Sequence, residues 1–464
     1  MNNEVSVSIT TGDNPKDAVI KGINNLGGIS KFIEKDETVF IKINLTSITG
    51  FPSNVNFNTL IEIIKLCKTA GAKKVYIGSF PYENLSIKDV SDELGLKEFL
   101  EYYGGELVFL DNSDKLKISN EEKLKLQKDS FKEVEVQDFI IQYPKIILNI
   151  DKFICLNQVN VHPLFNIHLS LLNLFSCIPF KFRKIFAKEN AEKDYIITDQ
   201  YKKKLISRIF DIYDIKKPNL VINDLFHFME GAGPFIYKDS KINPSKYIVC
   251  GNEAIATDYT TLKILGLNPE KNFLISHWIE KNIGILDLEK INLLGENLEE
   301  INLTFKQCKK RIEDIYVQKF NIKKGQICSG CFLQSYYLLN FLKTFLLKDL
   351  NYLPQCSYLF GANPLEPDSP NNIILYGDCA IKTTEKREFR TIEKEGRDIK
   401  TLFLKKAIME KKNKRILEIP GCPPNIQDTL NRFLKYFKKN NLPTLNFYMK
   451  KLNKTKKTVE FDES

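Results

Sequence analysis

Apolar runs and helix-period segments alternate along the first two thirds of the chain. Residues 38–45 have the length and β-branched content of a buried strand, residues 59–70 have the period of a helix that ends at a glycine, and 74–78 is the next strand. This order predicts a βαβ unit. Further buried strands are expected at 106–110, 152–156 and 220–224.

The same alternation returns in the last third of the chain. The runs 373–376 and 416–419 have the character of buried strands, and helix-period segments at 333–348 and 426–438 are interspersed with them. Strands that alternate with helices indicate a parallel sheet. We therefore predict an α/β fold class, with two α/β domains and mostly parallel sheets.

Length and composition agree with this organisation. The chain has 464 residues, of which 43% are apolar, which is enough for two or three domains with packed cores. We predict α/β domains over residues 1–300 and 305–450, followed by a polar tail over 451–464. The charged run 114–135 predicts exposed turns or a hairpin arm.

Charge and hydropathy narrow the classes of partner. The net charge of +10 is modest for this length, and lysines are spread along the chain rather than interleaved with aromatic residues on a nucleic-acid-binding module. The first 13 residues are polar, unlike a cleavable signal, and the apolar stretch 167–180 is too short to span a bilayer. Ten cysteines in such a chain fit a reducing compartment. We expect a cytoplasmic protein without a nucleic-acid partner or a membrane span.

Four cysteines in the last third of the chain are the strongest chemical signal. Cys328 and Cys331 form a C-x-x-C, whose two sulfurs can reach one metal centre. Cys379 and Cys422 each follow a predicted strand, within Gly-Asp-Cys and Pro-Gly-Cys-Pro-Pro. Loops that leave the carboxyl ends of parallel strands gather at one edge of a sheet. All four thiolates are therefore able to converge on one iron–sulfur cluster.

These three motifs resemble the cluster-binding set of hydrogenase small subunits and of related subunits of respiratory complex I. The resemblance covers residues 325–440 and implies a 4Fe-4S cluster that is held by Cys328, Cys331, Cys379 and Cys422. Complex I subunits carry adjacent cysteines where this chain has C-x-x-C. The hydrogenase form is therefore the closer match.

Two other interpretations of the cysteines stay open. Zinc also binds four thiolates, although structural zinc sites favour two C-x-x-C pairs and this chain has one. Cysteines are also often buried without any ligand. That is the interpretation for Cys67, Cys155, Cys177, Cys250 and Cys308. Cys356 lies in a loop-like stretch and is left open as a thiol near the cluster.

The first part of the chain, residues 5–300, resembles the DUF-362 family, a domain of unknown function that is often joined to iron–sulfur modules. The matching segments are 41–45, 70–75, 160–179, 231–234 together with Asp224, and 252–258. The chain departs from the family pattern at Ile43, Asn160, Leu172, Ser176 and Glu253. Asn160 and Leu172 replace lysines, a change that weakens any anion or phosphate site there.

Polar residues at strand ends and helix starts are the candidates for a ligand crevice, because open α/β sheets bind ligands at such an edge. They are Lys42, Asn44, His162, Asn173, Asp224 and Asp258. Among them, Lys42, His162 and Asp224 are the candidate catalytic residues. His162 is the candidate proton carrier because the ordinary pKa of histidine lies near neutrality. Helix capping or a satisfied buried hydrogen bond is the alternative for each.

The remaining histidines and the glycine motif give weaker evidence of function. His168, His227 and His277 are dispersed and are expected to be structural. The segment 231–234 lacks the third glycine of a dinucleotide fingerprint and the lysine of a P-loop. Nicotinamide and nucleoside triphosphate binding therefore have no support.

The sequence favours a redox function. We expect one 4Fe-4S cluster next to a ligand crevice of the first domain, where it passes one electron at a time to or from a redox partner protein or a small-molecule substrate. Such a protein is an electron-transfer protein or an iron–sulfur oxidoreductase. Two alternatives stay open: a ligand-binding or sensor protein with a structural cluster, and a non-redox hydratase or isomerase that uses the cluster or His162 as its acid catalyst.

Overall fold

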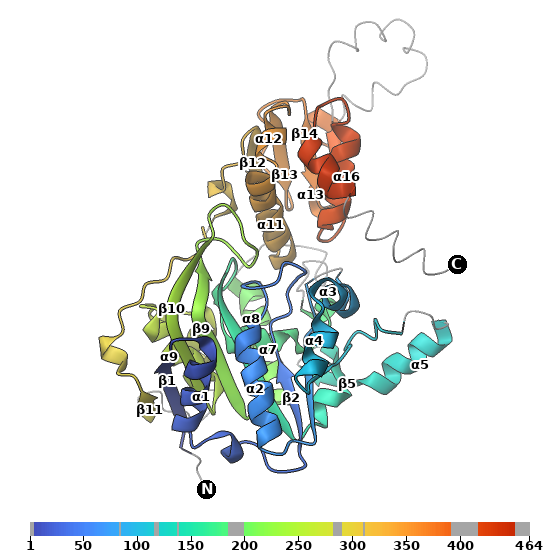
Figure 1. Ribbon diagram of the computed structural model, residues 1–464. Helices are drawn as coiled ribbons and strands as arrows, with labels where there is room; N and C mark the ends of the chain where they lie inside the picture. The colour runs from blue at the N-terminus through green and yellow to red at the C-terminus, as the bar shows by residue number, and fades with distance from the viewer. Residues whose placement is uncertain are drawn as a thin grey trace, which may run out of the picture. The chain divides into compact units, whose positions relative to one another are not determined.

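The computed structural model describes residues 4–82, 85–115, 120–136, 139–183, 199–281, 290–309, 311–390 and 416–450. The chain divides into two compact units. Unit 1 comprises Met1–Lys184 and Lys203–Cys308, and unit 2 comprises Ile185–Lys202 and Lys309–Ser464. Both units combine helices with mostly parallel sheets, as Figure 1 shows, so the predicted α/β fold class is confirmed.

Within the described residues, unit 1 is built on a mixed nine-stranded sheet. Its spatial order is β11 (Asn292–Gly295), β1 (Ser6–Thr11), β10 (Lys241–Gly251), β9 (Leu220–Glu230), β7 (Lys152–His162), β2 (Thr38–Lys42), β3 (Lys74–Gly78) and β4 (Glu106–Leu107). The ninth strand, β8 (Asn166–His168), pairs with the end of β7 in an antiparallel sense. Strands β9, β7, β2, β3 and β4 run parallel to one another, whereas β10 is antiparallel to both of its neighbours.

Helices cover both faces of this sheet. A Cβ added at Gly22 of α1 (Pro15–Asn25) would lie 2.7 Å from Cys250 Sγ, and one added at Gly251 would lie 2.1 Å from Thr257 Oγ1 of α9 (Ala254–Ile264). Neighbouring residues of a strand face opposite sides, so α1 and α9 lie on opposite faces of β10. The other helices of unit 1 are α2 (Phe57–Thr69), α3 (Ile87–Leu94), α4 (Leu96–Tyr102), α5 (Asn120–Ser130), α6 (Lys145–Leu148), α7 (Ser170–Leu174), α8 (Asp199–Ile215) and α10 (Phe273–Lys281).

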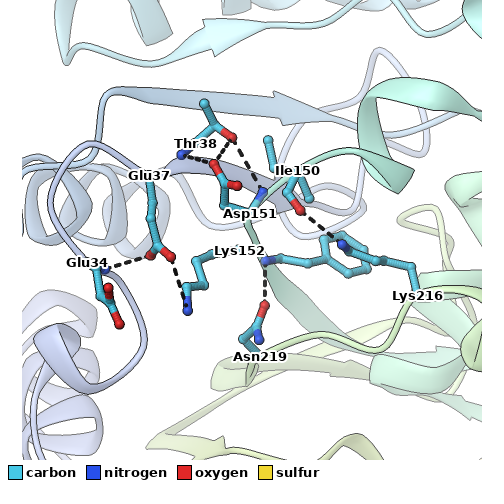
Figure 2. Close-up of polar contacts among 9 residues, drawn as sticks. Glu34, Glu37, Thr38, Ile150, Asp151, Lys152, Lys216 and Asn219 are labelled. Atoms are coloured by element: carbon cyan, nitrogen blue, oxygen red, sulfur yellow. Dashed lines mark hydrogen bonds and ion pairs between the residues drawn. The ribbon is translucent and has the colours of Figure 1, made fainter.

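Polar contacts fix the amino-terminal ends of the central strands, as Figure 2 shows. The Asp151 carboxylate accepts hydrogen bonds from the backbone nitrogen of Thr38 at 2.8 Å and from its hydroxyl at 2.6 Å, which ties β2 to the start of β7. Asn219, just before β9, accepts a bond from the backbone nitrogen of Phe153 at 2.8 Å. These bonds help to set the register that brings the carboxyl ends of the three strands to one edge.

The charged run at 114–135 is more regular than turns alone. Its described part contains α5 and most of β5 (Phe131–Val136), and β5 pairs with β6 (Phe139–Pro144) in an antiparallel sense. The predicted hairpin arm is thus preceded by a helix.

Unit 2 contains a four-stranded parallel sheet in the described residues. Its order is β12 (Phe320–Lys324), β13 (Cys356–Phe360), β14 (Ile373–Tyr376) and β15 (Ile416–Ile419). Its helices include α11 (Ser329–Phe345), α12 (Leu347–Leu350), α13 (Asp378–Thr383) and α16 (Ile426–Tyr436). The β14 side chains are fully buried, in agreement with the predicted apolar strand. The helix expected from 333 begins earlier, at Ser329, so it includes Cys331.

Candidate functional site

The four cysteines of the proposed cluster lie at the carboxyl ends of unit 2 strands. Cys328 is the N-cap residue of α11, which follows β12, and Cys331 lies in the first turn of that helix. Cys379 is the second residue of α13, which follows β14 directly, and Cys422 comes three residues after β15. Because the strands are parallel, the three segments share one edge of the sheet.

Backbone hydrogen bonds join two of these segments. Gly377 donates to the Ile419 carbonyl at 2.8 Å, and the backbone nitrogen of Asp378 donates to the Gly421 carbonyl at 3.0 Å. In return, the backbone nitrogen of Gly421 donates to the Asp378 carboxylate at 2.9 Å. The loop that contains Cys379 and the loop that contains Cys422 are thus held against each other.

The C-x-x-C turn packs against the same two loops. A Cβ added at Gly377 would lie 3.6 Å from Cys331 Sγ, and one added at Gly330 would lie 3.1 Å from the ring of Pro423. Gly377 has a φ of 92°, a left-handed backbone conformation that favours glycine. All three cysteine-bearing segments therefore meet around Cys331, which is only 3% exposed.

The charges of these thiols influence one another. Hydrogen bonds from the Cys331 thiol and from the backbone of Cys331 and Gly330 lower the pKa of Cys328 to about 6, against the opposing effect of burial. The pKa of Cys331 is raised well above its ordinary value by its hydrogen bond to Cys328, by burial, and by the charges of Cys328, Cys379 and Cys422. Cys328, Cys379 and Cys422 are therefore all near enough to Cys331 for their charges to act on it.

A single metal ion and a four-iron cluster require different distances between the cysteine sulfurs. In the part of the chain that the structure describes, no three His, Cys, Asp or Glu side chains lie close enough together to hold one metal ion. In a four-iron cluster each thiolate binds a different iron, which places the sulfurs roughly 6 to 7 Å apart. The donor set of thiolates on three touching segments fits such a cluster.

Cys356 lies elsewhere in unit 2. It is the first residue of β13, and its thiol donates to the Pro354 carbonyl at 3.3 Å. The four other cysteines lie at the carboxyl ends of the strands, so Cys356 is at the opposite edge of the sheet. Burial raises its pKa to about 12.

Lys42, a candidate catalytic residue of unit 1, is completely buried. It is the last residue of β2, and its Nζ donates to the Ile43 carbonyl at 2.8 Å and to Asn173 Oδ1 at 2.7 Å. Burial lowers the pKa of Lys42 to about 8. Asn173, on α7, donates in turn to the Leu156 carbonyl at 3.1 Å. Lys42 and Asn173 thus join β2, β7 and α7.

Asp224 does not lie at the end of its strand, which corrects the sequence-based placement. It is the fifth residue of β9, which continues to Glu230, and it is fully buried. Its carboxylate accepts hydrogen bonds from the Thr59 hydroxyl and, at 2.9 Å, from the backbone nitrogen of Phe226. Burial raises the pKa of Asp224 to about 6 although these donors oppose the shift.

His162 is the last residue of β7 and is partly exposed. Its Nδ1 accepts hydrogen bonds from the backbone nitrogens of Leu164 at 3.2 Å and Phe165 at 3.1 Å. Desolvation by the surrounding atoms lowers the pKa of His162 to about 3. The neutral ring therefore dominates near pH 7, with its proton on Nε2.

A second histidine, His168, lies beside His162, and the two ring centroids are 6.2 Å apart. Its Nδ1 lies 2.9 Å from Asn157 Oδ1 and 3.4 Å from Asn44 Nδ2. Desolvation, together with the charges of His162 and Lys42, lowers the pKa of His168 well below its ordinary value. The sequence predicts only a structural role for His168, and no local pattern indicates that it lies beside His162.

A chain of amide contacts connects His168 to Asp258. Asn157 Nδ2 donates to Asn223 Oδ1 at 3.0 Å, and Asn223 Nδ2 donates to Asp258 Oδ1 at 2.9 Å. Asn157 and Asn223 are paired in register on β7 and β9. Sequence reasoning did not single out either asparagine; the polar pairs Asn157–Gln158 and Asn223–Asp224, each directly after an apolar run, are the signal that could have indicated them.

Comparisons with known proteins bear on unit 1. Residues 39–263 match the family model described as "Domain of unknown function (DUF362)", so the chain carries this domain over those residues. No curated protein matches the chain. One solved structure with some similarity is that of a protein from Thermotoga maritima, with 10% identity and a TM-score of 0.26. The similarity covers 50% of this chain and 56% of that one, so this chain spans little more than half of the solved protein.

Among the helices that the structure describes, not one is both long enough and apolar enough to cross a bilayer.

Proposed function

We propose that Cys328, Cys331, Cys379 and Cys422 bind one 4Fe-4S cluster in unit 2, and that the protein functions in electron transfer or as an iron–sulfur oxidoreductase. The observation that carries this proposal is the contact of three cysteine-bearing segments at one sheet edge. A Cβ at Gly377 would be 3.6 Å from both Cys331 Sγ and the Gly421 carbonyl, so little more than van der Waals contact separates the segments. The motif resemblance to hydrogenase small subunits supports the same ligand set.

The residues around the thiolates suit this role. Backbone nitrogens of Gly330 and Cys331 act on the Cys328 sulfur and favour its thiolate form. Hydrogen bonds to cluster sulfurs and partial burial are the features by which proteins set the potential of such a centre. When bound, a 4Fe-4S cluster gains or loses one electron at a time. The electron would pass to or from a redox partner protein or a small-molecule substrate, and the expected adjacency of the cluster to a crevice in unit 1 stays a prediction.

The proposal is tested by anaerobic purification followed by an absorption spectrum and assays of iron and sulfide. We expect a brown protein with four iron and four sulfide per chain. Cys379→Ser and Cys422→Ser should each lose the chromophore, because each removes one of the four ligands. Stoichiometric zinc without iron or sulfide would overturn the proposal.

Two further variants are the controls. Cys356→Ser changes a buried thiol of the same unit at the opposite edge of the sheet, and Cys67→Ser changes a buried thiol of α2 in unit 1. Both variants should keep the chromophore. If Cys356→Ser loses it while Cys379→Ser keeps it, the ligand assignment is wrong.

A further inference from the structure

Two neighbouring histidines in unit 1 are held in opposite tautomers. The hydrogen bonds of a neutral imidazole distinguish its two ring nitrogens, since one nitrogen donates and the other accepts. His162 Nδ1 accepts from the backbone nitrogens of Leu164 and Phe165, at 3.2 and 3.1 Å. A nitrogen that accepts from N–H groups carries no proton, so the proton of His162 is on Nε2.

The tautomer of His168 follows from Asp258 through two asparagines. Backbone nitrogens of Ser170 and Leu171 donate to the Asp258 carboxylate, each at 3.0 Å, so this group is an acceptor. Asn223 must then present its NH2 group to Asp258, at 2.9 Å, and its carbonyl oxygen to Asn157.

The second asparagine completes the assignment. Because Asn157 presents its NH2 group to Asn223, its Oδ1 faces His168 Nδ1 at 2.9 Å, and this nitrogen must donate. The competing contact from Asn44 Nδ2 is longer, at 3.4 Å, beyond the usual range of a hydrogen bond. The proton of His168 is therefore on Nδ1, and its Nε2 is an acceptor.

The two Nε2 atoms are available to a ligand. Neither atom has a hydrogen-bond partner among the described residues. Neither is among the fully buried polar atoms that lack a partner, so both atoms are accessible. His162 and His168 are each partly exposed residues. The ring centroids are 6.2 Å apart, so the two imidazoles are neighbours and a small ligand is able to contact both.

Asn160 adds a second acceptor on the same strand pair. It lies opposite His168 in the β7–β8 ladder, so the two side chains share a face. Its Nδ2 donates to the Pro52 carbonyl at 2.6 Å, and its Oδ1 is buried without a partner in the described part of the chain. A buried acceptor without a partner is costly unless a ligand satisfies it.

We propose that His162, His168 and Asn160 form a binding site for a small polyhydroxy compound in unit 1. One hydroxyl oxygen of the ligand accepts from His162 Nε2–H and donates its hydrogen to His168 Nε2, and a neighbouring hydroxyl donates to Asn160 Oδ1. A hydroxyl group is both donor and acceptor, as this fixed pair requires. The site goes beyond the proposed cluster function and does not depend on it.

The tautomers are tested by nitrogen NMR of the full chain labelled with 15N-histidine, near pH 7. We expect His162 to carry its proton on Nε2 and His168 on Nδ1. Asn157→Leu removes the acceptor of His168 and should move its proton towards Nε2, whereas Asn157→Asp keeps an acceptor and should leave the proton on Nδ1. A wild-type His168 with its proton on Nε2 would overturn the proposal.

Binding is tested in the same samples with glycerol as the probe. Glycerol should shift the Nε2 signals of His162 and His168 in a saturable manner and leave His277 unchanged. Asn157→Leu should weaken binding about fivefold, the effect of one lost hydrogen bond. Cys379→Ser should bind as the wild type does, which separates this site from the cluster. Equal shifts at all histidines, or none at His162 and His168, would overturn the proposal.

Discussion

Asp258 caps the helix that begins at Ser170, 88 residues before it in the chain. Its Oδ1 accepts hydrogen bonds from the Ser170 backbone nitrogen at 3.0 Å and from the Ser170 hydroxyl at 2.7 Å, and its Oδ2 accepts from Leu171 at 3.0 Å. Helix α7 has no capping side chain of its own. A residue of α9 thus satisfies the first turn of α7 and holds Asn223 at the same time.

The first prediction concerns this cap. Asp258→Asn should lower the free energy of unfolding of unit 1 by about 1–3 kcal/mol, because an amide cannot accept from all the donors that the carboxylate satisfies. Trp278, the single tryptophan of the sequence, is buried on α10 of unit 1, so its fluorescence during urea unfolding reports the change. Asp92→Asn, on an exposed ion pair with Lys88, is the control and should have little effect.

A second prediction follows from Asp224. Burial raises its pKa from 3.8 to about 6, so the folded state holds this proton more tightly than the unfolded state. The unfolding free energy of unit 1 should therefore fall as the pH rises from about 4 to about 6, by up to about 3 kcal/mol. Asp224→Asn cannot titrate and should lose this part of the pH dependence.

The comparison between the wild type and Asp224→Asn isolates the contribution of Asp224 to the pH dependence of the unfolding free energy. The pKa of Asp258 is also raised to about 6 by burial, but that group is present in both proteins and its effect cancels. Tryptophan fluorescence in urea at several pH values is the measurement. Identical pH profiles for the two proteins would show that Asp224 does not titrate in this range.

The sequence predicted much of the sheet because apolar runs are local signals. The strand at 74–78 agrees with β3, and the strand at 373–376 agrees with β14. Asp224 was placed at a strand end because asparagine and aspartate are rare inside strands. In the structure Asn223 bonds to Asp258 on one face and Asp224 bonds to Thr59 on the other, so tertiary partners outweigh the local preference.

The candidate site was less accessible from the sequence. The four cysteines are recognisable because each lies in a short motif next to an apolar strand. The role of His168 depends on Asn157, Asn223 and Asp258, which are brought together by strand register and by the cap of α7. No local pattern records such a chain of contacts, because its members are up to 101 residues apart, from Asn157 to Asp258.

A third prediction concerns Lys42. Burial lowers its pKa from 10.5 to about 8, so between these values the unfolded state binds more protons than the folded state. The unfolding free energy of unit 1 should rise with pH across this range, by up to about 3 kcal/mol. Lys42→Met should abolish the rise, as followed by Trp278 fluorescence in urea. Lys97→Met, an exposed lysine on α4, should keep it.

The last prediction concerns the backbone conformation of Gly377 at the cysteine site. Gly377 and Gly95 both have positive φ, 92° and 59°, so alanine at either position should cost about 1 kcal/mol or more in local stability. A Cβ at Gly95 meets nothing within 4 Å, whereas one at Gly377 meets Cys331 Sγ, the Gly421 carbonyl and Pro424, each at 3.6 Å. Gly377→Ala should therefore reduce the iron and sulfide content of anaerobically purified protein, because strain at this residue displaces the loops that carry Cys379 and Cys422. Gly95→Ala should lower the unfolding free energy of unit 1, as followed by tryptophan fluorescence, and should leave the iron and sulfide content unchanged. Full cluster content in Gly377→Ala would mean that the three segments do not need this backbone conformation to bind the cluster.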